Sequence, residues 1–115
     1  MALNDAALNV AAGAIRTAIT HLSLHSSAPN SSGSNETSAA RVAAGWGAVS
    51  GSGDFVATGK AFTGVAANGA VTHVGFWSAS SGGTFYGYFA LTGDATANSA
   101  GEYTVSTVAV DGSAS

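Results

Sequence analysis

The sequence predicts a mainly β protein, a single antiparallel β-sandwich or barrel-like domain preceded by one N-terminal amphipathic helix, with residues 1–115 forming one domain. Three observations carry this prediction. Several short segments alternate apolar and polar residues with the period of two that a half-buried strand requires. Gly/Ser-rich turns separate them in a chain with 16 glycines. Helical periodicity is confined to the first twenty or so residues.

The expected helix covers about residues 4–20. Asn4 is a plausible N-cap, because its side-chain oxygen can accept from an early backbone N–H, and Asp5 then lies near the positive end of the helix dipole. Apolar residues recur at the spacing of one helical face: Leu8, Ala11, Ala12, Ile15, Ile19 and Leu22. This narrow stripe of small residues fits packing onto a sheet or a neighbouring helix.

The β domain is expected over about residues 21–110. Its first strand, residues 21–25, places Leu22 and Leu24 on one face and His21, Ser23 and His25 on the other. Further strands are expected in five segments: 41–46, 54–62, 70–78, 84–91 and 103–110. A polar connection follows at 93–101, and the chain ends in the polar tail 111–115.

The strands 70–78 and 84–91 carry large apolar groups on both faces. In the first, strict alternation separates Trp77 from Phe76; in the second, it separates Phe85 and Phe89 from the tyrosines. We therefore expect this hairpin to be covered on two sides, one by a second sheet and the other by the helix or a neighbouring subunit.

Residues 26–40 form the long loop of the molecule. They are dense in turn formers and contain almost nothing that could be buried. Long loops without structure are uncommon in compact domains unless they are functional or held by a partner. We therefore expect this loop to face a partner, and we expect removal of residues 30–35 to leave the fold intact.

Composition narrows the possible partners. Only 8% of residues are charged, and the three cations, Arg16, Arg41 and Lys60, are too scattered to neutralise a run of phosphates. We expect no nucleic-acid partner. The absence of cysteine excludes disulfides and thiolate chemistry, and no apolar run or basic N-terminal segment indicates a membrane span or a signal peptide. We expect no membrane partner either.

The sequence offers no convincing catalytic, cofactor-binding or metal-binding residues. His21 and His25 would share a helical face only if the helix continued, and the alternation there favours a strand whose histidines are satisfied at its end or at an interface. The segment 47–51 has the wrong spacing for a nucleophile elbow. We expect no enzyme activity, no cofactor and no metal.

Four aromatic residues could form a platform for carbohydrate stacking: Trp46, Trp77, Tyr86 and Tyr88. The alternative is that they belong to the core and to a subunit interface. With the polar residues Asn30, Asn35, Glu36 and Arg41, they make up the eight candidate interface residues.

Three segments carry a resemblance to a known family. Residues 22–29 (Leu-Ser-Leu-His-Ser-Ser-Ala-Pro), 33–36 (Gly-Ser-Asn-Glu) and 71–77 (Val-Thr-His-Val-Gly-Phe-Trp) occur in this order, with Ala40-Arg41 and Gly82-Gly83 at the expected places. Together, over roughly residues 20–92, they resemble small tailed-bacteriophage virion proteins described as tail fibre or minor tail proteins.

The resemblance implies a non-enzymatic virion structural protein, made in the host cytoplasm before assembly, that acts through repeated protein–protein contacts. The implied partners are copies of itself, with a trimer expected, and other virion proteins. A capsid decoration (cement) protein on the outer head surface and a host-surface or glycan-binding module remain alternatives. Glu36 and Arg41 occupy positions that recur in the family, and we expect a charge pair that closes the loop.

Overall fold

A computed structural model describes residues 4–92 and 96–111. One helix and six strands form in chain order: α1 (Asp5–Ala18), β1 (His21–His25), β2 (Val42–Ala43), β3 (Asp54–Phe62), β4 (His73–Trp77), β5 (Phe85–Ala90) and β6 (Tyr103–Asp111). Residues 93–95 of the expected polar connection and 112–115 of the expected tail lie outside the described residues.

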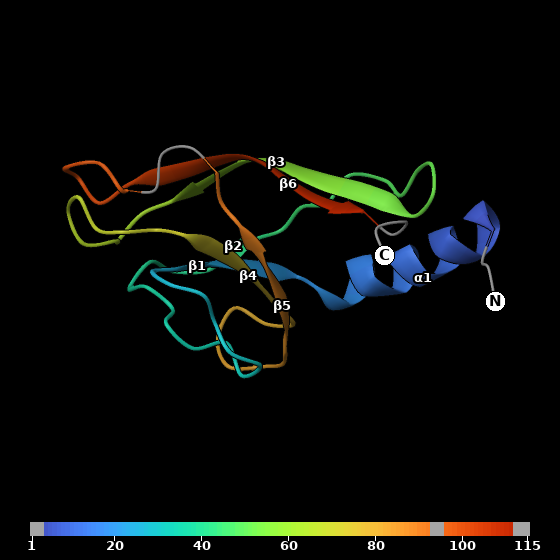
Figure 1. Ribbon diagram of the computed structural model, residues 1–115, viewed down its shortest axis with the longest axis horizontal. Helices are drawn as coiled ribbons and strands as arrows, with labels where there is room; N and C mark the ends of the chain where they lie inside the picture. The colour runs from blue at the N-terminus through green and yellow to red at the C-terminus, as the bar shows by residue number, and fades with distance from the viewer. Residues whose placement is uncertain (1–3, 93–95, 112–115) are drawn as a thin grey trace.

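The strands form two antiparallel layers (Figure 1). One sheet has four strands in the order β2-β1-β4-β5, and the other consists of β3 and β6. The mainly β, sandwich-like fold with one N-terminal helix is confirmed, and the strands of the described residues do not close into a barrel. The expected strand 41–46 shrinks to the two residues of β2. The Ala44 N–H still donates to the Thr20 carbonyl beside β1, but by Gly47 the chain has crossed to the second layer, where the Gly47 N–H donates to the Val56 carbonyl of β3.

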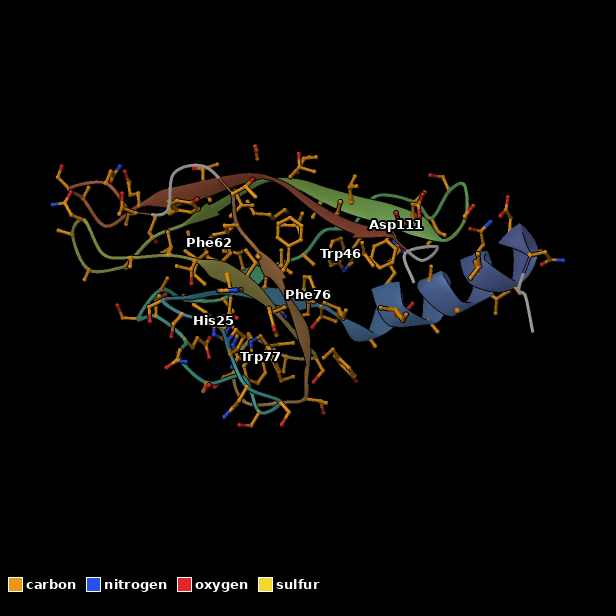
Figure 2. All side chains as sticks on the ribbon, in the orientation of Figure 1. His25, Trp46, Phe62, Phe76, Trp77 and Asp111 are labelled. Atoms are coloured by element: carbon orange, nitrogen blue, oxygen red, sulfur yellow. The ribbon has the colours of Figure 1, made fainter. Side chains whose placement is uncertain are left out.

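The core lies between the two layers. Leu22, Leu24 and Val74 from the four-stranded sheet are fully buried against Phe55 and Phe62 of β3 (Figure 2). Burying a large apolar side chain contributes roughly 1.5–3 kcal/mol. The alternation read from β1 therefore identifies the core face correctly.

Helix α1 begins where the sequence predicts. The Asn4 side chain accepts a hydrogen bond from the Ala7 N–H at 3.0 Å. Only part of the predicted apolar face is covered: Ala12 is buried, but Ile15 is 46% exposed. The expected packing of the stripe onto a sheet does not extend to Ile15, because the helix packs against β3 and the turn before it at Gly53. Packing on a neighbouring helix stays a prediction.

A β-bulge in the β4–β5 pair changes which face Phe85 occupies. The register shifts between Phe76 and Trp77, so that Phe85 pairs with Trp77 while Phe89 still pairs with Val74. Strict alternation placed Phe85 and Phe89 on one face. That prediction is wrong for Phe85, since an inserted residue reverses the direction of the side chains that follow it.

Candidate functional site

The face of the four-stranded sheet that points away from β3 and β6 carries a connected set of polar contacts. We call it the outer face. Figure 2 shows His25 and Trp77 on this side and Trp46 and Phe62 between the layers. The chain's own loop 26–40 covers part of the outer face. The expectation that the helix covers it is wrong, because α1 packs against β3. Coverage of the rest by a neighbouring subunit stays a prediction.

Trp77 lies at the centre of the outer face and is 7% exposed. Its ring contacts that of Phe85, with centroids 5.0 Å apart. Gly33 of the loop, at φ +80°, lies directly against the indole: a Cβ at this position would come within 2.5 Å of Trp77 Cζ2. Glycine is therefore required at residue 33 both for its backbone conformation and for the close approach.

A chain of hydrogen bonds begins at the indole N–H. Trp77 Nε1–H donates to Ser23 Oγ over 2.8 Å, and Ser23 Oγ lies 2.7 Å from His25 Nε2. His25 Nδ1 lies 2.7 Å from the Ser34 carbonyl oxygen, which can only accept. The proton of a neutral His25 is therefore on Nδ1, and Nε2 accepts from the Ser23 hydroxyl.

Burial of His25 lowers its pKa below the ordinary histidine value of 6.5. The hydrogen bond to Ser34 and the charge of Glu36 oppose this shift, whereas His73 and Arg41 add to it. Desolvation is the largest effect, so the neutral ring is the favoured form. A protonated ring would direct a second donor at Ser23 Oγ and leave the serine hydroxyl proton without its acceptor.

Arg41 also holds the loop to the sheet, because it contacts both the Trp77 ring and Glu36 of the loop. Its guanidinium carbon lies 3.6 Å from the centroid of the Trp77 ring. It forms a bidentate ion pair with Glu36, in which Nε donates to Oε2 at 2.8 Å and Nη2 donates to Oε1 at 3.1 Å. Nη1 also donates to the carbonyls of Ala79 and Gly82 in the β4–β5 connection, at 3.0 and 2.8 Å. The expected Glu36–Arg41 pair is present, and it joins two loops.

We define the Trp77 cluster as Ser23, His25, Glu36, Arg41, Trp77 and Phe85. Its Ser–His contact has the geometry of a nucleophile and its base. Ser23 and His25 are each 0% exposed, however, so the serine hydroxyl is closed to solvent in this structure. Within residues 4–92 and 96–111, no group of three or more His, Cys, Asp or Glu side chains could hold a metal ion. The arrangement is built for rigidity.

The structure brings together three of the eight candidate interface residues, Glu36, Arg41 and Trp77. Asn30 and Asn35 stabilise the covering loop: Asn30 Oδ1 accepts from Ser32, and Asn35 Nδ2 donates to the Ala28 carbonyl. Both asparagines remain exposed.

The remaining three candidates are aromatic and lie outside the Trp77 cluster. Trp46 is 9% exposed inside the sandwich, where its Nε1–H donates to the Ile19 carbonyl at 2.8 Å. Tyr86 and Tyr88 on β5 are 51% and 50% exposed. The four aromatic residues therefore do not share one open face.

The prediction that the loop has almost nothing to bury is wrong. Pro29, Gly33 and Ala39 are buried, and the Ser34 carbonyl is needed by His25. Sequence reasoning missed Ser23, His25 and Phe85 as members of the cluster. The signal available for Ser23 was its position on the same strand face as His25, since a polar strand face must find partners when it is covered.

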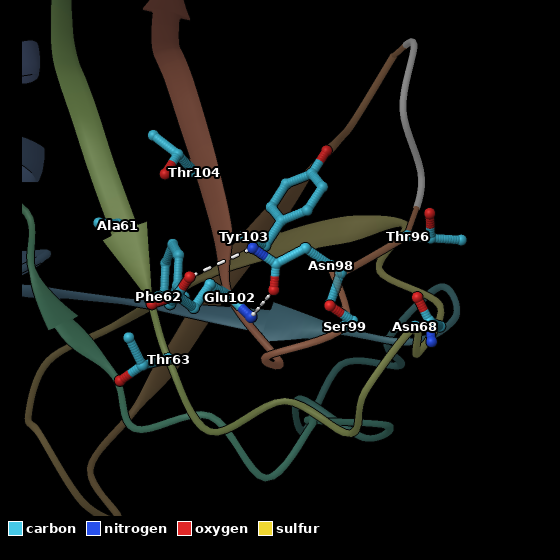
Figure 3. A pocket seen from close by; sticks show the side chains of 11 residues that line it. Ala61, Phe62, Thr63, Asn68, Thr96, Asn98, Ser99, Glu102, Tyr103 and Thr104 are labelled. Atoms are coloured by element: carbon cyan, nitrogen blue, oxygen red, sulfur yellow. Dashed lines mark hydrogen bonds between the residues drawn. The ribbon is translucent and has the colours of Figure 1, made fainter.

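A separate hollow of about 770 Å³ lies at the far end of the β3–β6 pair (Figure 3). Its lining is mainly uncharged and polar. Glu102 is the one carboxylate among the described lining residues, and Asn98 Nδ2 donates to it over 3.2 Å. One carboxylate engaged in a turn does not make an acid–base pair.

No helix among the described residues is long and apolar enough to cross a membrane. In comparisons with known proteins, a family model described as "Podophage GP4 fiber I protein gp80" matches residues 2–113. No curated protein and no solved structure matches the chain. Since the match spans nearly the whole sequence, this chain belongs to the podophage GP4 fiber I (gp80) family.

Proposed function

We propose that this protein is a non-enzymatic structural component of a bacteriophage tail fibre, which acts in the virion through contacts with copies of itself and with other virion proteins. The observation that carries the proposal is the family match over residues 2–113. It favours the fibre over a capsid decoration protein. Synthesis in the host cytoplasm before assembly belongs to the same proposal.

The outer face agrees with a structural role. A buried hydrogen-bond chain, an arginine that joins two loops and a sealed Ser–His contact all stabilise one conformation, and none of them opens to solvent as a catalytic site must. The protein is therefore proposed to carry out no reaction.

Helix α1 supports self-association. Val10 is 76% exposed and Ile15 is 46% exposed, and Ala6, Ala11 and Ala14 are exposed as well. An apolar helix face of this kind is usually covered in a stable protein. We propose that copies of the chain meet through α1 and form a homo-oligomer, with a trimer as the expected state.

Labelling of intact particles tests the fibre assignment. An epitope tag placed after Ser115 should be found by immunogold microscopy at the tail, in a few to a few dozen copies per particle. Labelling spread over the head surface would contradict the proposal and favour capsid decoration.

A further inference from the structure

A second hollow, of about 520 Å³, lies between the loop and the edge strand β5. We call it the β5 hollow. Its described lining residues are Pro29, Asn30, Ser31, Phe85, Tyr86, Gly87 and Tyr88. Volumes of about 300–1,000 Å³ are usual for small-molecule sites. One chain provides all of these lining residues.

Aromatic rings line one wall of the β5 hollow and are held in place by the outer face. Tyr88 packs edge-on against His73, with ring centroids 5.3 Å apart and planes at 76°. Phe85 is held by Trp77 at 5.0 Å. About half of the Tyr86 and Tyr88 surfaces nevertheless stay open to solvent. The contact with His73 holds the Tyr88 ring in position, so a ligand could cover this ring at little entropic cost.

The opposite wall presents hydrogen-bonding groups. Asn30 Oδ1 accepts from the N–H and the hydroxyl of Ser32, at 2.9 and 2.7 Å, which fixes the amide in place. In the described parts of the chain, Asn30 Nδ2 and the Ser31 hydroxyl of this wall form no hydrogen bond, and neither do the Tyr86 and Tyr88 hydroxyls of the aromatic wall. The described lining residues include no charged side chain.

We propose that the β5 hollow binds a neutral sugar ring. The C–H face of a pyranose packs on flat aromatic surfaces, and its hydroxyls both donate and accept, as the amide and hydroxyl groups of this wall do. A carboxylated or sulfated sugar would have to desolvate its charge with no cation to receive it. The proposal adds a ligand class to the proposed fibre function, in line with the glycan-binding alternative, and it places the platform on β5 rather than on the tryptophans.

Saturation-transfer NMR on the full-length protein tests the proposal. The probes are the methyl glycosides of glucose, galactose and N-acetylglucosamine, with the methyl glycoside of N-acetylneuraminic acid as the anionic counterpart. At least one neutral probe should give a saturable signal with a dissociation constant of about 1 mM, as expected for an open site with few contacts. The anionic probe should bind at least about tenfold more weakly.

Variants locate the signal. The double variant Tyr86→Ala/Tyr88→Ala should weaken binding about tenfold or more, whereas Tyr88→Phe, which keeps the ring, should weaken it only about two- to threefold. Ser31→Leu fills the hollow from an exposed position and should abolish binding without touching the core. Thr58→Ala, at an exposed position on β3 in the other sheet, is the control, and it should bind like the parent chain.

Three results would overturn the proposal: no saturable signal from any neutral probe, a signal that survives both the double variant and Ser31→Leu, or equal binding of the anionic probe. Loss of the oligomer in the double variant, without any sugar signal, would show that the hollow is instead a contact between copies. Incorporation of the double variant into particles reports separately on the fibre function, so the two proposals can fail independently.

Discussion

At the scale of single residues, Trp77 joins the loop to the sheet. It contacts Gly33 above and Phe85 beside it, and donates to Ser23 below. Trp77→Ala should lower the free energy of unfolding by about 3–5 kcal/mol, because both the transfer of the ring and the cavity left behind are unfavourable. Chemical denaturation monitored by circular dichroism measures this.

Tyr86→Ala is the matched control for Trp77→Ala. Tyr86 is 51% exposed, so the variant should lower the free energy of unfolding by no more than about 1 kcal/mol. An unchanged melt for Trp77→Ala, with an intact oligomer, would contradict the burial described above.

Arg41 is expected to be irreplaceable by lysine. Lysine cannot stack a planar group on Trp77 while forming a two-pronged pair with Glu36 and donating to two carbonyls. Arg41→Lys should lower the free energy of unfolding by about 1–3 kcal/mol. Glu36→Gln, which leaves the stacking and the carbonyl contacts in place, should cost about 1 kcal/mol or less. If Arg41→Lys and Glu36→Gln lowered the free energy of unfolding equally, the ion pair alone would provide the stabilisation.

His25 makes stability depend on pH. Its pKa in the folded state is lowered by burial, so the unfolded chain binds the proton more readily. The stabilisation is complete above the unfolded pKa of about 6.5 and is lost as the pH falls toward the lower folded pKa. The melting temperature should therefore drop between pH 7.5 and pH 5.

The contribution of His25 to this drop is isolated by His25→Gln. The variant should be less stable than the parent at pH 7.5, and the difference between the two should narrow at pH 5. A difference that is constant across this range would remove His25 as the titrating group.

At the scale of elements, the loop 26–40 acts as a lid on the outer face, not as a passive connector. Removal of residues 30–35 would uncover Trp77 and take away the acceptor of His25 Nδ1. The expectation that such a deletion leaves the fold intact is therefore replaced by a predicted loss of stability.

A pair of glycine substitutions measures the contact between the lid and the sheet. Gly33 and Gly82 both have positive φ, +80° and +63°, but a Cβ at Gly33 meets the Trp77 ring, while nothing lies within 4 Å of one at Gly82. Gly82→Ala should cost about 1 kcal/mol from the backbone alone. Gly33→Ala should cost about 2–4 kcal/mol, since overpacking adds to the strain. Similar losses for the two variants would mean that the loop does not press on the indole.

At the scale of the whole molecule, α1 extends to one end of a body with dimensions of 47 × 26 × 22 Å (Figure 1). Its open apolar face predicts that the purified protein is an oligomer. Light scattering should show a mass well above that of the 11.1 kDa chain. Val10→Glu should shift the mass toward the monomer, because a charge on the face opposes its burial.

The control for Val10→Glu is Ser80→Glu, which adds the same charge to an exposed loop away from the helix. It should leave the mass unchanged. A stable monomer in the parent chain, unaffected by dilution, would contradict self-association.

The sequence by itself determined the local elements of this protein. The N-cap at Asn4, the alternation of Leu22 and Leu24, and the turn at residues 51–53 set helix and strand boundaries through interactions between near neighbours. The tertiary structure alone decided how the outer face is covered. Gly33 of the polar loop is buried only because the ring of Trp77, distant in the chain, packs against it. The Ser34 carbonyl faces the sheet because His25 Nδ1 donates to it. Likewise, the bulge that turns Phe85 toward Trp77 arises from the pairing of two strands and leaves no mark in the alternation of either one.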